Sequence, residues 1–369
     1  MRTMRAARLH APGQPFQIET LPVPEPGPRD VLVKVSACGI VPNLKNVISN
    51  YTKRHPTLPA RKLPAIYGLD AVGTVDQLGE EVQSIQAGDR VYINPALTCG
   101  SCKACRSNVP TNCPSFTFHG YFGFGPGSAP IFERYPYGGF GEYLIIPASN
   151  LVTLSDTVKD AEAVRLGYLG TAYSAIRKSN FEPGQTVLID GVTGTLGVGA
   201  AMVALAMGAS KVFGTGRNTV MLEKVKAICP ERVTTIQMPN EAAHDVVMRE
   251  TGGEGVHAVV SAVGPGVPVE STLNALLALA RGGSLVNCGG LANAIPLDPL
   301  LMMRRQLQYK GSLWFSTDEA QMLADMVGSG VLDLSAFEHQ PVPLNDINQA
   351  LEDIDQRNGG FSNIFVTHA

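Results

Sequence analysis

The pattern of hydrophobic and polar residues changes near residue 160. Before it, short apolar runs such as VLVKVSACGI (31–40) alternate with turns rich in proline and glycine. Long amphipathic segments are few there, which predicts a compact, barrel-like β domain. Beyond it, strands expected at residues 186–190, 211–215, 233–237, 257–263 and 284–288 alternate with helical segments. That alternation predicts a parallel sheet with helices on both faces.

The C-terminal part of the chain is predicted to return to the first domain. The pattern beyond Trp314 indicates helices at residues 317–327 and 344–356, a strand-like segment at 341–343 and a last strand at 362–367. We therefore expect an α/β protein with a β-rich domain over residues 1–156 and a doubly wound parallel sheet over 157–314. Residues 315–369 would then pack against the first domain.

One strand–turn–helix unit carries a candidate nucleotide site. Residues 186–190 form a short apolar run, residues 191–197 (GVTGTLG) form a glycine-rich turn, and small uncharged residues continue to 208. Glycines let the backbone approach a pyrophosphate, and the helix N-terminus offers free N–H groups to it. Val192 stands where the common G-x-G-x-x-G pattern has a glycine, and an ordinary packed βα turn is the alternative. The predicted cofactor-binding residues are Gly191, Thr193, Gly194, Thr195, Leu196 and Gly197.

The end of the next strand favours NADP(H) over NAD(H). An acidic residue about 20 positions past the glycine turn would bind the ribose 2′-hydroxyl of NAD. This chain instead has Gly216, Arg217 and Asn218 there. Gly216 opens space, and the planar guanidinium of Arg217 suits a 2′-phosphate. The alternative is that Arg217 is a solvated loop arginine.

Composition and charge narrow the classes of partner. The 369 residues favour two domains, and 17% charged with 44% hydrophobic residues is typical of a folded soluble protein. The net charge of −3 gives no indication of nucleic acid or an anionic membrane as a partner. The N-terminal residues lack the apolar core of a signal peptide, and no run reaches transmembrane length. We expect a cytoplasmic protein that acts on a small molecule.

Four of the seven cysteines form the sharpest motif in the chain. They follow the spacing C-x2-C-x2-C-x7-C and are Cys99, Cys102, Cys105 and Cys113, within a lobe at residues 95–115. Close thiolates in a reducing compartment suit tetrahedral Zn²⁺. Four protein ligands leave no open position, so this zinc would be structural. An iron–sulfur cluster or disulfides are the alternatives, although the usual cluster spacings differ.

These segments together resemble the zinc-type alcohol dehydrogenases of the medium-chain dehydrogenase/reductase superfamily. The matching segments include PVPEPGPRDVLVKVSACGI, LPAIYGLDAVGTVDQLGEEV, the cysteine lobe, GGFGEYLIIPASNLVTL, LGYLGTAYSAI, the glycine turn and PLNDINQALEDI. The resemblance covers nearly the whole chain. It implies a GroES-like substrate domain, a Rossmann domain, a cleft between them, and a homodimer or homotetramer.

The chain departs from this family at the catalytic zinc. Val41 stands where the first ligand, a cysteine, would be, and Leu69 replaces the histidine of the family's G-H-E triplet. The third ligand lies in a segment that here contains Gly167 and Tyr168. Valine and leucine donate no electron pair, and Asp70 alone cannot hold a metal against water. We therefore expect no catalytic zinc.

The resemblance then implies a metal-free hydride transfer. Zinc-free relatives, the quinone and enoyl reductases, reduce C=C bonds conjugated to a carbonyl, and we expect this reaction with NADPH. One alternative is a carbonyl reductase or alcohol dehydrogenase that polarises C=O with side-chain donors alone. Another is a nucleotide-binding homologue without catalysis.

Candidate site residues follow from position in the family. The catalytic candidates are Asn43 and Asn46 at the position of the proton relay, Tyr168 as donor or acid, and Asp70 as an acceptor. For these, the alternatives are helix capping by the asparagines, aromatic packing by Tyr168, and pairing of Asp70 with a cation such as Arg165. Further cofactor contacts are expected at Thr171, Cys288, Gly289, Gly290 and Trp314. The family's pyrophosphate-binding arginine near the last strand is replaced by about Asn363, so that contact is weakened or lost.

Overall fold

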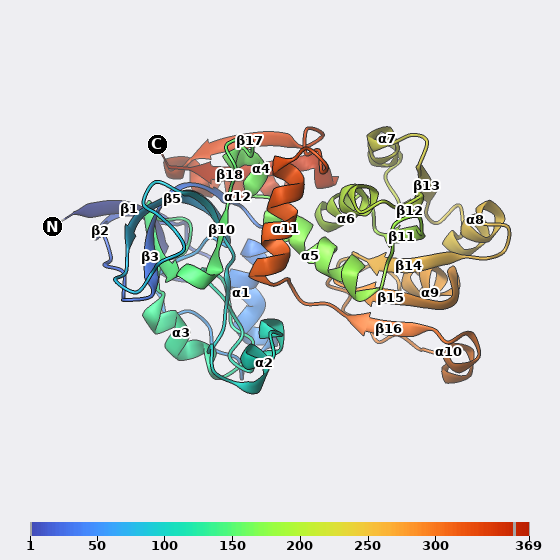
Figure 1. The fold of residues 1–369 in the computed structure, drawn as a ribbon, viewed down its shortest axis with the longest axis horizontal. Helices are drawn as coiled ribbons and strands as arrows, with labels where there is room; N and C mark the ends of the chain where they lie inside the picture. The colour runs from blue at the N-terminus through green and yellow to red at the C-terminus, as the bar shows by residue number, and fades with distance from the viewer. Residues whose placement is uncertain (1, 357–358, 369) are drawn as a thin grey trace.

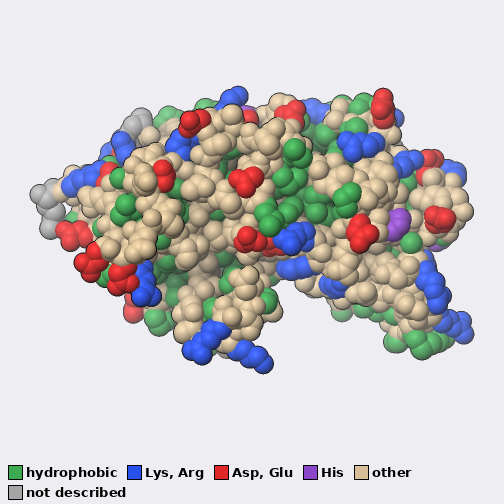
Figure 2. All heavy atoms as spheres, in the orientation of Figure 1, with side chains coloured by type: hydrophobic (Ala, Val, Ile, Leu, Met, Phe, Trp, Pro, Cys, Tyr) green, Lys and Arg blue, Asp and Glu red, His purple; other side chains and the backbone are tan. Residues whose placement is uncertain are grey.

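A computed structural model describes residues 2–356 and 359–368 of the chain. Figure 1 shows a β-rich domain on one side, an α/β domain on the other, and helices α5 (Leu166–Lys178) and α11 (Thr317–Gly328) between them. None of the described helices is long and apolar enough to cross a membrane. Acidic and basic side chains are interspersed over the face drawn in Figure 2.

The first domain, which we call the catalytic domain, is built on a seven-stranded sheet. Its strands follow the order β10-β6-β5-β3-β18-β17, with β9 also paired to β3. The central strand β3 is buried along most of its length. The strands of this sheet are β3 (Asp30–Gly39), β5 (Asp70–Leu78), β6 (Arg90–Ile93), β9 (Tyr143–Pro147), β10 (Leu151–Thr153), β17 (Glu338–Pro343) and β18 (Ser362–Thr367).

Smaller elements complete the catalytic domain. A three-stranded sheet has the order β2-β1-β4, and β7 pairs with β8. These strands are β1 (Thr3–Leu9), β2 (Gln17–Pro22), β4 (Ala65–Ile66), β7 (Ala96–Leu97) and β8 (Thr117–Phe118). The helices are α1 (Leu44–Arg54), α2 (Lys103–Arg106), α3 (Ser128–Arg134) and α4 (Asp160–Ala163).

The second domain, which we call the coenzyme domain, contains a six-stranded parallel sheet of order β13-β12-β11-β14-β15-β16. The strand order reverses between β11 and β14, and ligands of such sheets bind at the carboxyl ends of the strands beside this point. The strands are β11 (Thr186–Asp190), β12 (Lys211–Gly216), β13 (Val233–Gln237), β14 (Val256–Ser261), β15 (Leu279–Asn287) and β16 (Gln308–Gly311). The helices are α6 (Thr195–Ala206), α7 (Thr219–Ile228), α8 (Ala243–Glu250), α9 (Val269–Leu277) and α10 (Pro299–Arg305).

The predicted fold class is confirmed. The differences lie at element ends, in one additional strand and in one helix that is divided. The helix after the glycine turn spans Thr195–Ala206, and Gly208 beyond it has a φ of 90°. Strand β14 ends at Ser261, two residues before its predicted end. The short strand β16 was not predicted. The predicted helix at 344–356 is divided into a 3-10 turn, α12 (Ile347–Asp353) and a second 3-10 turn.

The end of the chain returns to the sheet of the catalytic domain. Strand β18 pairs antiparallel with β3, with Val366 opposite Cys38, and β17 pairs with β18 in parallel. Between α12 and β18, the 3-10 turn η5 (Gly359–Phe361) lies against α6 of the coenzyme domain. The chain therefore crosses between the two domains more than once.

Candidate functional site

A cavity lies at the carboxyl ends of β11 and β12, beside the reversal of strand order. Its lining includes Gly191, Thr193 and Gly194 from the predicted turn and Gly216 and Arg217 from the end of β12. Asp190, Thr215 and residues from the segments 238–242 and 262–274 complete its wall. The structure thus brings both parts of the predicted nucleotide site to a single cavity.

The glycine turn has the geometry of a phosphate cradle. Gly191 has a φ of 87°, and a Cβ on Gly197 would lie 2.1 Å from the Gly191 carbonyl oxygen. Only residues without a side chain permit this close packing of turn and helix. Helix α6 begins at Thr195, whose buried hydroxyl has no hydrogen-bond partner among the described residues. Because the first N–H groups of a helix also lack partners within the helix, this end fits an anionic group.

The prediction that Gly216 opens space at the end of β12 is wrong, because Thr193 and Leu222 already fill that space. A Cβ on Gly216 would lie 2.7 Å from Thr193 Cγ2 and 2.9 Å from Leu222 Cδ2, so the strand end has no room for an acidic side chain there. Arg217 is exposed at the cavity wall. Glu241 also lines the cavity, and its carboxylate accepts a hydrogen bond from the Gln237 N–H at 3.3 Å.

Other predicted cofactor residues have structural roles visible in the fold. The Asn218 side chain caps α7 by accepting the Met221 N–H at 3.2 Å, and Thr171 donates to the Gly167 carbonyl oxygen at 2.8 Å. Residues 288–290 follow β15, where a Cβ on Gly289 would lie 2.3 Å from the Val263 carbonyl oxygen. Neither this segment nor Trp314 lines the cavity described above.

Trp314 connects the two domains. Its Nε1 donates to Asn94 Oδ1 at 2.9 Å, and its ring packs edge-on against Phe118 with centroids 4.6 Å apart. The φ of Trp314 is 56°, a left-handed conformation that is uncommon for a bulky side chain. The packing of the buried indole holds this backbone conformation in place.

The four cysteines of the lobe meet as predicted. The sulfur atoms of Cys99, Cys102, Cys105 and Cys113 all lie within 4.8 Å of one another, and the described residues contain no other such group of three or more possible metal ligands. Backbone N–H groups of Ser101 and Cys102 lower the pKa of the Cys99 thiol to about 6. This donor set fits a tetrahedral Zn²⁺ held by four thiolates.

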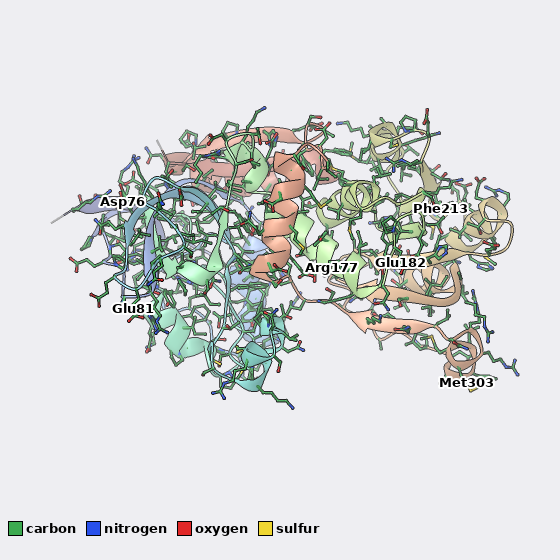
Figure 3. All side chains as sticks on the ribbon, viewed as in Figure 1. Asp76, Glu81, Arg177, Glu182, Phe213 and Met303 are labelled. Carbon is green, nitrogen blue, oxygen red and sulfur yellow. The ribbon has the colours of Figure 1, made fainter. Side chains whose placement is uncertain are left out.

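A groove separates the lobe from α5. It is lined by residues 108–111 on the lobe and by Ser174, Arg177 and Lys178 on α5. Figure 2 shows the hollow between the lower part of the catalytic domain and the coenzyme domain. Figure 3 places Arg177 on α5, in the region where the domains meet.

A second, smaller cavity contains Asp70 and Tyr168, two of the predicted catalytic residues. Arg165 and the backbone segments 39–42 and 362–364 also line it. The Asp70 carboxyl is buried and accepts a hydrogen bond from the Tyr92 hydroxyl at 2.8 Å. A Cβ on Gly167 would lie only 2.0 Å from Asp70 Oδ1. The Asp70 carboxyl therefore fills the space into which a side chain at position 167 would project.

Burial dominates the charge state of Asp70. Desolvation raises its pKa from 3.8 to about 7, although the Tyr92 hydrogen bond and the charge of Arg165 both act in the opposite direction. Arg165 is thus the cationic neighbour that the sequence suggested. Val41 and Leu69, which are expected from the sequence at two ligand positions of the family, are buried apolar side chains.

The two asparagines lie at the start of α1 and differ in their hydrogen-bond partners. Asn43 is the N-cap residue of α1 but makes no capping hydrogen bond with its side chain; its Oδ1 accepts the Tyr121 hydroxyl at 2.6 Å. Asn46 accepts a hydrogen bond from Asn50 at 3.0 Å. Both asparagines are exposed and neither lines the Asp70 cavity.

Sequence reasoning missed Tyr92 and Tyr121. Tyr92 lies on β6, which pairs with β5 next to Asp70, and a tyrosine on a strand paired with a buried acid was the available signal. Tyr121 lies in the aromatic and glycine-rich segment 115–137, whose conformation no periodic pattern specifies. The Tyr121 hydroxyl is buried, and desolvation raises its pKa well above the ordinary value.

Comparisons with known proteins agree with this architecture. Residues 27–156 match the alcohol dehydrogenase GroES-like domain, and residues 195–329 match the zinc-binding dehydrogenase family. An NAD-dependent alcohol dehydrogenase from Sulfolobus acidocaldarius is 26% identical over 355 residues, which cover 96% of each chain.

Two solved structures share the fold. A protein named AibC has a TM-score of 0.83 at 25% identity, covering 99% of this chain and 96% of its own. A protein described as a zinc-binding dehydrogenase, from Sinorhizobium meliloti 1021 and bound to NADP, has a TM-score of 0.81 at 23% identity, with both chains fully covered. The two matched families follow one another along the chain in the order of its two domains. The chain belongs to the zinc-type alcohol dehydrogenase family of the medium-chain dehydrogenase/reductase superfamily, a family of oxidoreductases.

Proposed function

We propose that this protein is an NADPH-dependent reductase of a small α,β-unsaturated carbonyl compound and works without a catalytic zinc. The observation that carries the proposal is the packing of Asp70 against Gly167. One ligand position has no side chain, and the two others are the apolar Val41 and Leu69. A carboxylate without further donors is a poor zinc site.

The nucleotide, when bound, supplies the hydride, and the chain positions the groups that complete the reaction. In a conjugate reduction the hydride goes to the β-carbon and a proton goes to the α-carbon, so one donor to the carbonyl oxygen suffices. Tyr168 and the Asn43–Tyr121 pair are the donors that we assign to orienting the substrate oxygen. Asp70, with its raised pKa, holds a proton near neutral pH.

The choice of NADP(H) rests on the end of β12. The absence of room for an acid at Gly216 and the exposed guanidinium of Arg217 at the cavity wall both favour a 2′-phosphate. The NADP bound to the Sinorhizobium meliloti protein agrees with this choice. The Sulfolobus acidocaldarius relative is named NAD-dependent, so the binding of NADPH and of NADH has to be measured side by side.

A second candidate is reduction of a C=O bond or oxidation of an alcohol. The name of the same relative, an alcohol dehydrogenase, favours it. Without a metal, side-chain hydrogen bonds alone would have to polarise the carbonyl oxygen. Such donors lower the barrier by a few kcal/mol. We rank this reaction below conjugate reduction, for which one donor to the carbonyl oxygen suffices.

The test is oxidation of NADPH in the presence of a panel of enals, enones, saturated ketones and saturated aldehydes, followed by analysis of the products. Saturated carbonyl products from enals or enones support the proposal. Alcohols as the only products support the second candidate. Tight NADPH binding without turnover of any compound would instead indicate a nucleotide-binding protein without catalysis.

A further inference from the structure

The 3-10 turn η5 approaches the glycine turn more closely than any side chain would allow. The Gly360 N–H donates to the Thr193 carbonyl oxygen at 3.0 Å. A Cβ on Gly360 would lie 2.3 Å from the Gly194 carbonyl oxygen. Gly359 has a φ of 67°, and a Cβ there would lie 2.6 Å from the Met221 sulfur. We call Gly359 and Gly360 the glycine strap.

The strap affects the charge distribution of the nucleotide turn. The carbonyl oxygens of Thr193 and Gly194 lie against Gly360, and the first of them is neutralised by a hydrogen bond. A carbonyl oxygen that faced a pyrophosphate would repel it, whereas the N–H groups at the start of α6 attract it. By holding the Thr193 carbonyl and packing against the Gly194 carbonyl, the strap favours the turn conformation that receives an anion.

Arg165 fixes the strap from the side of the catalytic domain. It precedes α5 and is buried, and its Nη2 donates to the Gly360 carbonyl oxygen at 3.1 Å. The guanidinium carbon lies 4.4 Å from the ring centroid of Phe337 and 5.3 Å from that of Tyr168. The same side chain lines the Asp70 cavity. Arg165 therefore contacts the strap and the candidate catalytic cavity at once.

We propose that Arg165 is a positioning residue for nucleotide binding, which acts through Gly360 on the glycine turn and joins that turn to the Asp70 cavity. Arg165 orients the Gly360 peptide, and that peptide in turn holds the Thr193 carbonyl. The inference requires only that the turn binds a nicotinamide nucleotide. Its test does not depend on which substrate the protein reduces.

The test measures the NADPH dissociation constant of the full chain by fluorescence titration. We expect Arg165→Ala to weaken NADPH binding about tenfold and Arg165→Lys, which keeps a cationic donor, to restore most of the affinity. Gly360→Ala, whose methyl group displaces the strap, should also weaken binding about tenfold. Two matched controls should bind as the wild type does. Arg177→Lys changes an arginine of α5 that also lies over a tyrosine ring, and Gly311→Ala adds a methyl group with no atom within 4 Å.

The double variant Arg165→Ala/Gly360→Ala distinguishes positioning from a general loss of stability. If Arg165 acts through Gly360, the double variant binds NADPH within about threefold of Gly360→Ala alone. Additive weakening of about a hundredfold would overturn the proposal, as would wild-type affinity in Gly360→Ala or in Arg165→Ala. If Arg165→Ala does not fold, Arg165→Met, which keeps an apolar stem and removes the donor to the Gly360 carbonyl oxygen, supplies the same comparison.

Discussion

At the scale of single residues, Asp70 is a buried carboxyl whose surroundings determine its charge. Its carboxyl lies where a side chain at Gly167 would project, and Tyr92 is its hydrogen-bond donor. A buried carboxyl with one donor and a cation nearby retains its proton up to neutral pH. The sequence suggested Arg165 as a neighbour of Asp70, whereas Tyr92 was missed although it lies on a strand that pairs with β5.

The titration of Asp70 predicts a stability effect with a defined sign. The pKa in the folded state, about 7, lies above the ordinary 3.8. The stability that this group contributes is therefore complete below about pH 4 and is lost as the pH rises through 7. Asp70→Asn keeps an acceptor for Tyr92 without the charge. The unfolding free energy of Asp70→Asn minus that of the wild type should rise by about 1–3 kcal/mol from pH 5 to pH 8, measured by urea denaturation. An equal difference at both pH values would contradict the burial of a titrating carboxyl.

Arg217 predicts a selective effect on the cofactor. Arg217→Ala should weaken NADPH binding at least about tenfold and leave NADH binding within about twofold, because only NADPH carries the 2′-phosphate. Fluorescence titration with each nucleotide provides the measurement. Arg249→Ala, an exposed arginine paired with Glu250, serves as the control. Equal weakening of both nucleotides would show that the 2′-phosphate is not bound at this position.

At the scale of elements, the glycine turn and α6 act as one unit. Gly197 is required because a Cβ there would lie 2.1 Å from the Gly191 carbonyl oxygen. Gly199, two residues further along α6, would place its Cβ 3.1 Å from a terminal methyl of Leu169, which can move. The two positions therefore differ in function although both are glycines of the same helix.

This difference predicts opposite outcomes for two alanine variants. Gly197→Ala should weaken NADPH binding more than tenfold, because the added methyl group forces the turn away from the helix. Gly199→Ala should bind NADPH nearly as the wild type does. Circular dichroism and a titration of each variant test this pair. Comparable affinities of the two variants would contradict the role assigned to the turn.

We propose that a zinc ion bound by the four cysteines holds the lobe together, since its helix α2 has only four residues and none of them is buried. Cys105→Ser should therefore lower the zinc content and make residues 95–115 sensitive to limited proteolysis. Cys229→Ser, which changes a half-buried cysteine outside the cluster, should retain the metal. An intact, protease-resistant lobe in metal-free Cys105→Ser would show that zinc does not hold it together.

At the scale of the whole molecule, the sequence predicted the architecture but not the contacts between its parts. Alternating periodicity predicted the parallel sheet, and the return of the tail follows from a last strand that pairs with β3. The contact of Gly360 with Thr193 joins residues 167 positions apart, and no local pattern encodes it. No local pattern encodes the hydrogen bond between Tyr121 and Asn43 either, because Tyr121 lies in an irregular segment and Asn43 lies at the start of α1. Local rules specify elements, whereas these contacts depend on how the domains pack.

The whole molecule is thus an oxidoreductase fold with a cluster of four cysteines and a separate cavity lined by Val41, Asp70 and Tyr168, at which we propose catalysis without a metal. The most direct measurement is the zinc content per chain of protein that turns over NADPH with an enone, determined by elemental analysis after mild chelation. We expect one zinc per active chain, retained by the four cysteines, with unchanged turnover. Two zinc ions per chain, with turnover lost in step with removal of the second, would contradict metal-free catalysis at Asp70.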